Sequence, residues 1–210
     1  MATHTFIYDD ACPMCKGYTS LFTGLNLSER RAFSKLKPGD IPNLDLDRGR
    51  HEIPLYNAET GEVRYGLEAM TTVIGNALPY LKPLIRSRFF IAALKPLYWL
   101  ITYNRRVIAG TKPPKEGFDC APDYHVGWRV AYLALVALFV LLLGFPNPML
   151  VLGFGLALVA GLLLLRDRLT FLGHFATVVL MAAILLAALP GTGGVVLAYG
   201  VALVEGWRRL

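Results

Sequence analysis

Two long uncharged runs dominate the C-terminal half of the chain. Val130–Leu165 and Leu169–Val204 each contain 36 residues without one Asp, Glu, Lys or Arg. A membrane-spanning helix needs about 20 apolar residues, so each run is long enough for two spans. Residues typical of turns interrupt each run near its middle, at Phe145–Pro148 and at Leu189–Gly194. The pattern predicts four transmembrane helices, near residues 128–145, 148–165, 170–189 and 193–208.

The basic residues beside these runs predict an orientation in the membrane. The two turns within the runs carry no charge, whereas Arg129, Arg166–Arg168 and Arg208–Arg209 lie at the other ends of the predicted helices. Cytoplasmic loops are enriched in Lys and Arg, and the polar first residues do not resemble a signal peptide. We therefore expect an integral protein of an inner or plasma membrane with N- and C-termini cytoplasmic. The alternative is a soluble protein in which the two runs form buried helical hairpins.

The N-terminal part contains shorter hydrophobic segments that predict alternating strands and helices. Thr5–Tyr8 is typical of a buried strand, and Lys16–Leu27 has apolar residues at helical spacing. Pro54–Asn57 and Glu62–Tyr65 are typical of two strands joined by a turn. A helix is expected over Leu67–Leu78.

A CxxC motif, Cys12–Cys15, connects the first predicted strand to the first predicted helix. The partial positive charge at a helix N-terminus stabilises a thiolate, which is the reactive form of cysteine. We therefore predict a redox-active CxxC, with Cys12 as the exposed nucleophile and Cys15 as the thiol that resolves the mixed disulfide. Asp9 is either a proton acceptor for Cys15 or a residue that holds the loop, and both interpretations stay open.

The order of these elements is typical of a thioredoxin-like fold. In that fold a cis-proline before the third strand lies beside the CxxC and helps to bind the substrate backbone, and Pro54, preceded by Ile53, occupies this position. The expected fold class is an α/β thioredoxin-like N-terminal domain plus a C-terminal all-α transmembrane bundle of four helices. We expect the domain core at residues 1–80, basic amphipathic helices and a linker at 81–127, and the four transmembrane helices at 128–210.

One short motif resembles a known family. Tyr8–Cys15 resembles the Asp-x-x-Cys-x-x-Cys signature of the DCC family of predicted thiol-disulfide oxidoreductases, and Tyr98–Arg106 more weakly resembles the aromatic, Asn-Arg-containing end of those domains. The resemblance implies a thioredoxin-like domain in which Asp9, Cys12 and Cys15 are the functional residues. Members of the family often have Gly after the aspartate, whereas this chain has Asp10, a second carboxylate that opposes thiolate formation.

A basic segment lies between the two halves. From Ala69 to Lys115 the chain has 8 Lys and Arg residues and no Asp or Glu, and large apolar residues alternate with the basic ones. This mixture is typical of helices that lie on an anionic membrane surface, so we predict membrane lipid as a partner and no nucleic acid. The alternative is a helix packed on the N-terminal domain with a solvated basic face.

The composition agrees with a membrane protein. The 210 residues are 55% hydrophobic and 17% charged, with a formal net charge of +6, whereas soluble domains are usually about 25% charged. This composition excludes disordered, collagen-like and disulfide-rich classes. Small residues recur at every fourth position in the last predicted helix, at Gly194, Ala198, Ala202 and Gly206. Such spacing lets helix backbones approach closely and favours a compact bundle or a homodimer.

The remaining candidate ligands and thiols give weaker signals. A structural zinc site needs four ligands, but the candidates beside the CxxC have no recognisable spacing, so we expect no metal and no cofactor. These candidates are His4, His51, Cys120 and His125. Acidic neighbours disfavour a thiolate at Cys120, so it is predicted to be a bystander and not an exchange partner of the CxxC.

These observations predict a membrane-anchored thiol-disulfide oxidoreductase whose CxxC faces the cytoplasm. Its expected substrate is a protein or small-molecule disulfide. One alternative is a non-catalytic thioredoxin-like docking or assembly module of a membrane complex, and another is a redox sensor that binds lipid or quinone. No cysteine follows Cys120, so the predicted helices contain no thiol that could carry reducing equivalents across the membrane.

Overall fold

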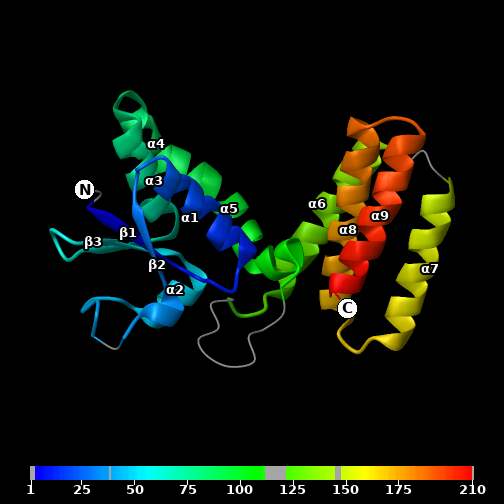
Figure 1. Cartoon of the computed structure of the whole chain (residues 1–210), viewed down its shortest axis with the longest axis horizontal. Helices are drawn as coiled ribbons and strands as arrows, with labels where there is room; N and C mark the ends of the chain where they lie inside the picture. The colour runs from blue at the N-terminus through cyan, green and yellow to red at the C-terminus, as the bar shows by residue number, and fades with distance from the viewer. Residues whose placement is uncertain (1–2, 38, 112–121, 145–147, 210) are drawn as a thin grey trace. The chain divides into compact units, whose positions relative to one another are not determined.

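The computed structural model describes residues 3–37, 39–111, 122–144 and 148–209 (Figure 1). The chain divides into two compact units. The N-terminal unit comprises Met1–Tyr103 and Pro113–Tyr124, and the C-terminal unit comprises Asn104–Lys112 and His125–Leu210. Cys120, the predicted bystander thiol, lies outside the described residues.

A four-stranded mixed sheet forms the centre of the N-terminal unit. Its strand order is β2-β1-β3-β4, with β1 (His4–Tyr8) parallel to β2 (Glu29–Ala32) and antiparallel to β3 (Pro54–Asn57). The edge strand β4 (Val63–Tyr65) is antiparallel to β3. Because Phe6 pairs with Leu55 and the two strands are antiparallel, the end of β1 and the start of β3 lie at the same end of the sheet.

Helices cover this sheet and extend beyond it. They are α1 (Pro13–Gly24), α2 (Leu46–His51), α3 (Gly66–Ala77), α4 (Lys82–Ile85) and α5 (Arg88–Ala109). Successive residues of a strand point to opposite faces, and so Phe6 and Ile7 of β1 belong to different core clusters. Phe6 packs with Val73 of α3 and stacks on Phe22 of α1, with 5.4 Å between the ring centroids, whereas Ile7 packs with Phe33.

The fold class predicted from the sequence is wrong. The structure is 70% helical with a small four-stranded mixed sheet near its N-terminus, and only a partial thioredoxin-like N-terminus is possible. The strands have three to five residues each, and β2 is mainly polar, with the sequence ERRA. Beyond the sheet, the 22-residue α5 continues through Pro96. The sequence pattern predicted which segments form strands and which form helices. It did not predict that the sheet would be so small compared with the helices.

Four helices make up most of the C-terminal unit. They are α6 (Val126–Leu143), α7 (Pro148–Leu164), α8 (Arg168–Ala188) and α9 (Thr192–Arg209). Among the described residues, only α6 and α8 are long and apolar enough to cross a membrane. The apolar α7 has 17 residues, and α9 ends in a turn with Glu205, Arg208 and Arg209. The structure therefore supports two of the four predicted spans by length and composition.

Local side chains fix where two of these helices begin. The His125 imidazole accepts a hydrogen bond from the Trp128 N–H at the start of α6 (3.3 Å), and the Asp167 carboxylate accepts one from the Thr170 N–H at the start of α8 (3.1 Å). Hydrogen bonds from Thr170 hold the pKa of the Asp167 carboxyl below its usual range. Asp167 is therefore ionised at neutral pH, and its charge complements the positive end of α8.

Small residues allow the last three helices to pack closely. Ala182 of α8 and Ala198 of α9 are fully buried in one cluster with Leu150 of α7. Gly161 of α7 lies against the ring of Phe171 on α8, and a Cβ atom at this position would collide with that ring. Gly153, on the same helix, has open space where a Cβ would be.

We expect Gly161→Ala to destabilise the C-terminal unit by about 1–3 kcal/mol, because the added methyl forces the Phe171 ring out of its position. Gly153→Ala is the matched control on α7 and should leave the midpoint temperature of thermal unfolding unchanged or slightly raised. Thermal unfolding of the two variants in detergent measures the difference. Equal unfolding midpoints for the two variants would show that Gly161 does not pack against the Phe171 ring.

Candidate functional site

The CxxC motif lies at the start of α1, directly after β1. Cys12 is the N-cap residue, with φ −93° and ψ 115°, and its carbonyl accepts a hydrogen bond from the Lys16 N–H (3.0 Å). Pro13 is the first helical residue, a position where its fixed φ and missing N–H favour helix initiation. Cys15 follows in the first turn. Residues three apart on a helix share a face, so the helix start brings the two cysteines together.

Both thiols are buried, which corrects the prediction that Cys12 is exposed. Cys12 is 4% exposed and Cys15 is 5% exposed, whereas the neighbouring Ala11 and Pro13 lie on the surface. This burial results from tertiary packing, which the position of a residue in a motif does not reveal. A reagent in solution therefore has little direct access to either cysteine in this conformation.

Asp9 and Asp10 shape the loop that leads to Cys12. The Asp9 carboxylate accepts a hydrogen bond from the Ala11 N–H (2.8 Å), and its carbonyl accepts one from the Cys12 N–H (3.3 Å). The Asp10 carboxylate accepts a hydrogen bond from the Ser34 hydroxyl (2.8 Å). Of the two interpretations of Asp9, this geometry favours the residue that holds the loop.

Pro54 and Ile53 are core residues at the start of β3. The peptide bond before Pro54 is trans, so the predicted cis-proline is wrong. Most X–Pro bonds are trans in folded proteins. Here Pro54 is fully buried, and a Cβ at Gly49 would lie 3.2 Å from its ring. Ile53 packs with Phe6 in the sheet core, and its carbonyl accepts a hydrogen bond from the Gly66 N–H (2.9 Å). The strand register places both residues at the end of the sheet that carries the CxxC. Their side chains are buried in the core and do not form a substrate-binding surface.

Arg30 is a residue near the CxxC that the sequence patterns did not reveal. It donates a hydrogen bond to the Lys16 carbonyl (3.2 Å) and another to the Ser20 hydroxyl, and its guanidinium lies 5.2 Å from the centroid of the Tyr8 ring. These contacts join β2 to the first turns of α1. Because Phe6 pairs with Arg30, Tyr8 and Arg30 are diagonal neighbours across two parallel strands. Only the strand register, and no local motif, could have predicted this contact.

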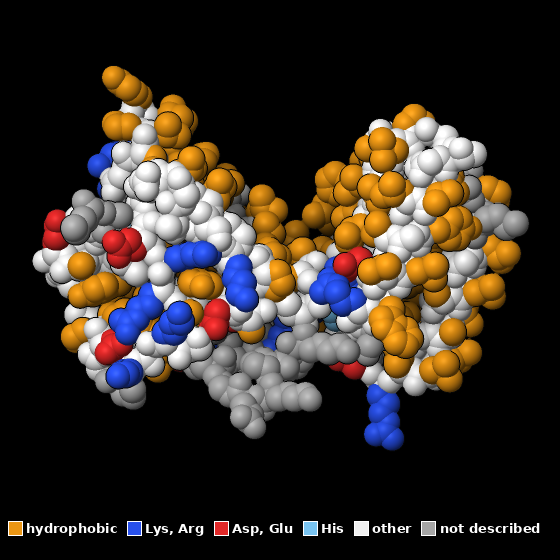
Figure 2. Space-filling view, viewed as in Figure 1, with side chains coloured by type: hydrophobic (Ala, Val, Ile, Leu, Met, Phe, Trp, Pro, Cys, Tyr) orange, Lys and Arg blue, Asp and Glu red, His pale blue; other side chains and the backbone are white. Residues whose placement is uncertain are grey.

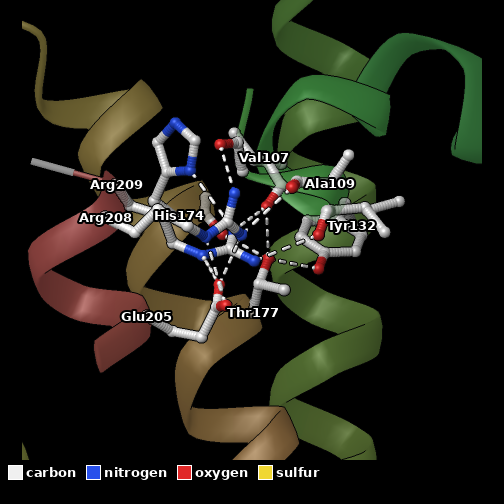
Figure 3. A network of polar contacts seen from close by, with 11 residues as sticks. Val107, Ala109, Tyr132, His174, Thr177, Glu205, Arg208 and Arg209 are labelled. Carbon is white, nitrogen blue, oxygen red and sulfur yellow. Dashed lines mark hydrogen bonds and ion pairs between the residues drawn. The ribbon is translucent and has the colours of Figure 1, made fainter. Parts of the chain in front are cut away.

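A second polar cluster lies in the C-terminal unit, where the last turn of α9 meets the end of α5 (Figure 3). Arg208 donates hydrogen bonds to the carbonyls of Ala109 (3.2 Å) and Gly110 (3.0 Å). Arg209 donates to the carbonyls of Val107 and Ile108, the latter at 3.1 Å. The last carbonyls of a helix have no partner within the helix, and the positive charge of a guanidinium also complements the negative helix end. The two arginines therefore cap α5.

Glu205 and Thr177 complete this cluster. The Glu205 carboxylate accepts hydrogen bonds from the Nε atoms of Arg208 (3.1 Å) and Arg209 (3.0 Å), which holds both guanidinium groups toward α5. On α8, the Thr177 hydroxyl lies 3.1 Å from the Val107 carbonyl and 2.7 Å from the Tyr132 hydroxyl. The cluster thus links α5, α6, α8 and α9. From the sequence, the two arginines predicted only the orientation of the helices in a membrane.

The described residues contain no group of three or more His, Cys, Asp or Glu side chains that could hold a metal ion. The arginine cluster binds backbone carbonyls within the unit, so its geometry is that of a structural cap.

We expect Arg209→Ala to destabilise the C-terminal unit by about 1–3 kcal/mol, because buried carbonyls at the end of α5 lose their donors. The same variant should speed backbone hydrogen exchange in residues 104–110. Arg166→Ala, which removes an exposed arginine from the turn before α8, is the matched control. Hydrogen exchange read by mass spectrometry measures both effects. An unchanged rate of hydrogen exchange at the end of α5 in Arg209→Ala would show that Arg209 does not cap this helix.

Comparisons with known proteins add no further constraint on the site. No protein-family model, curated protein or solved structure matches this chain. The resemblance to the DCC family therefore stays a prediction, and it depends on the motif that contains Asp9, Cys12 and Cys15.

Proposed function

We propose that the protein is a membrane-anchored thiol-disulfide oxidoreductase whose reactive dithiol is Cys12 and Cys15. The observation that carries the proposal is the position of both cysteines at the N-terminus of α1, with Cys12 as the cap residue and Cys15 in the first turn. The unsatisfied N–H groups at a helix start stabilise negative charge on sulfur. A helix start therefore favours the thiolate form of a cysteine, which is the form that attacks a disulfide.

The proposed reaction is a dithiol–disulfide exchange in two steps. The Cys12 thiolate attacks one sulfur of the substrate disulfide, so that a Cys12–substrate disulfide forms and the other substrate sulfur leaves as a thiolate. The Cys15 thiolate then attacks the Cys12 sulfur, which closes the Cys12–Cys15 disulfide and releases the second substrate thiol. The substrate gains two electrons and the CxxC loses two. A separate dithiol must reduce the CxxC before the next cycle.

The burial of the thiols predicts which substrates react first. Because Cys12 is only 4% exposed, a small disulfide should reach its sulfur with less opening of the structure than a folded protein disulfide needs. The Thr19 hydroxyl donates a hydrogen bond to the Cys15 carbonyl (2.6 Å), which holds the backbone of the resolving cysteine in the helix. Small or extended disulfides are therefore the proposed substrate class.

We further propose that α6–α9 all span the membrane, with both termini in the cytoplasm. Long apolar side chains lie exposed on every one of these helices, including Leu141, Leu156, Ile184 and Leu203. Figure 2 shows that hydrophobic side chains cover much of the viewed face of the C-terminal unit. Trp207 is exposed beside the charged end of α9, a position that suits the aromatic belt at a membrane interface.

Replacing Cys15 should trap the first step of the proposed reaction. In a Cys120→Ala background, Cys15→Ser exposed to 2-hydroxyethyl disulfide should accumulate one mercaptoethanol adduct on Cys12, because the resolving thiol is absent. The parent dithiol should instead form an internal disulfide with no adduct. Intact-mass and peptide mass spectrometry measure both products.

Cys12→Ser is the matched control and should react at the background rate of a buried single thiol. The oxidoreductase proposal fails if Cys12→Ser and Cys15→Ser form adducts equally slowly. That outcome, together with full cellular function of a Cys12→Ala/Cys15→Ala double variant, would instead support the non-catalytic docking module.

Reporter fusions test the proposed topology. Alkaline phosphatase fused after Gly191, in the turn between α8 and α9, should be active, because this enzyme folds only outside the cytoplasm. Green fluorescent protein fused after Arg209 should fluoresce, because it folds inside. Four spans with cytoplasmic termini are wrong if the two reporters give the same location or the reverse one.

A further inference from the structure

An exposed apolar patch lies around α4 and the start of α5 in the N-terminal unit. Tyr80 is 98% exposed and Phe89 is 80% exposed, and Leu81, Leu84 and Leu97 are also at the surface. A contiguous apolar surface of this kind marks an interaction site in a water-soluble unit. Figure 2 shows hydrophobic side chains gathered where Figure 1 labels α4.

The first half of α5 is unusual because its outward face is apolar. A helix on the surface of a soluble unit normally turns polar side chains to the solvent. Between Arg88 and Ile101, by contrast, six of the eight exposed residues are apolar, and the other two are basic. These eight are Arg88, Phe89, Ala92, Ala93, Lys95, Pro96, Leu97 and Ile101. Exposure to water alone does not account for so many apolar side chains on this face.

The charged residues within the segment that carries the apolar face all have one sign. Arg88 and Lys95 lie seven residues apart and therefore on one side of α5, and Lys82 and Arg86 belong to α4 and the turn after it. Between Glu68 and Glu116 the chain contains no acidic residue. A basic border around an apolar face complements an anionic surface with an apolar interior, which is the structure of an acidic lipid leaflet.

The end of α5 connects this face to the proposed membrane region. Residues 104–110 belong to the C-terminal unit, where Arg208 and Arg209 bind the last carbonyls of α5. The charged end of a spanning helix lies at the level of the lipid headgroups. If α9 spans the membrane, the last turn of α5 therefore lies at the level of the headgroups.

We infer that the exposed face formed by the turn Pro79–Leu81, α4 and the first half of α5 binds the anionic phospholipids of a membrane leaflet. Its exposed residues are Tyr80, Leu84, Phe89, Leu97, Arg88 and Lys95. The apolar side chains enter the boundary between headgroups and acyl chains, and the basic side chains pair with lipid phosphates. The inference depends on the proposed membrane insertion of α6–α9 and is independent of the thiol chemistry of Cys12 and Cys15.

Photocrosslinking in reconstituted full-length protein tests this inference. The photoreactive residue p-benzoylphenylalanine replaces Tyr80 or Phe89, with Leu46 of α2, 51% exposed, as the control position in the same unit. A third position, Leu203 on α9, reports on membrane insertion itself. Vesicles contain either phosphatidylcholine alone or equal parts of phosphatidylcholine and phosphatidylglycerol, and mass spectrometry identifies the lipid adducts.

We expect lipid adducts at Tyr80 and Phe89 in the anionic vesicles to exceed those at Leu46 by about fivefold or more, and to fall in phosphatidylcholine alone. Arg88→Glu/Lys95→Glu should lower these adducts in anionic vesicles about tenfold. Lys35→Glu/Lys37→Glu, which makes the same change in net charge elsewhere on the unit, should not.

Three outcomes would overturn the inference. Adducts at Leu203 without adducts at Tyr80 and Phe89 would leave the membrane helices in place and show that the face does not bind lipid. Adducts between Tyr80 or Phe89 and protein would show that a second copy or the C-terminal unit covers the face. Adducts at none of the positions would remove both the membrane insertion and the inference that depends on it.

Discussion

The carbonyl groups at the end of α5 impose the constraint on which the C-terminal unit depends. A helix that ends inside packed apolar surroundings leaves carbonyls that neither the helix nor water satisfies. Arg208 and Arg209 supply the missing donors, and each guanidinium offers more N–H groups than any other side chain. Glu205 accepts hydrogen bonds from both arginines, so that the buried guanidinium of Arg209 has a charged partner. Gly110, with φ 67°, ends α5 locally, and one turn of α9 supplies donors to the carbonyls that this end leaves.

Helix ends also determine the chemistry of the N-terminal unit, with the opposite polarity. At α1 the unsatisfied groups are N–H donors, and the side chains placed there are the thiols of Cys12 and Cys15. An N–H donor favours an anion, whereas a carbonyl favours a cation. The same backbone property would thus favour the proposed thiolate at one helix end, and it accounts for the arginine cap at another. Hydrogen bonds of Asp9 and Asp10 hold the loop at the start of α1. A hydrogen bond of Glu205 holds Arg209 at the end of α5.

Features that depend on neighbouring residues were predictable from the sequence, and features that depend on distant contacts were not. The absence of charge and the turn residues Pro148 and Gly191 placed α6–α9 within a few residues, and the strand before Cys12 is present as β1. The burial of Cys12, the trans peptide before Pro54 and the proportion of helix result from tertiary packing, which leaves no local pattern. The bonds from Arg208 to the end of α5 join residues 98 and 99 positions apart, so no motif could indicate them.

The packing of the N-terminal unit connects the proposed lipid face to the CxxC. Gly66, with φ 59°, begins α3, and a Cβ there would lie 3.0 Å from the Tyr98 hydroxyl of α5. α3 in turn packs through Val73 on the core that contains Phe6 and contacts Phe22 of α1. A leaflet-bound α5 would therefore hold the start of α1 at a fixed height above the lipid. At that height the buried Cys12 would meet disulfides on membrane-associated partners more often than disulfides in solution, because the anchor raises the effective concentration of the former.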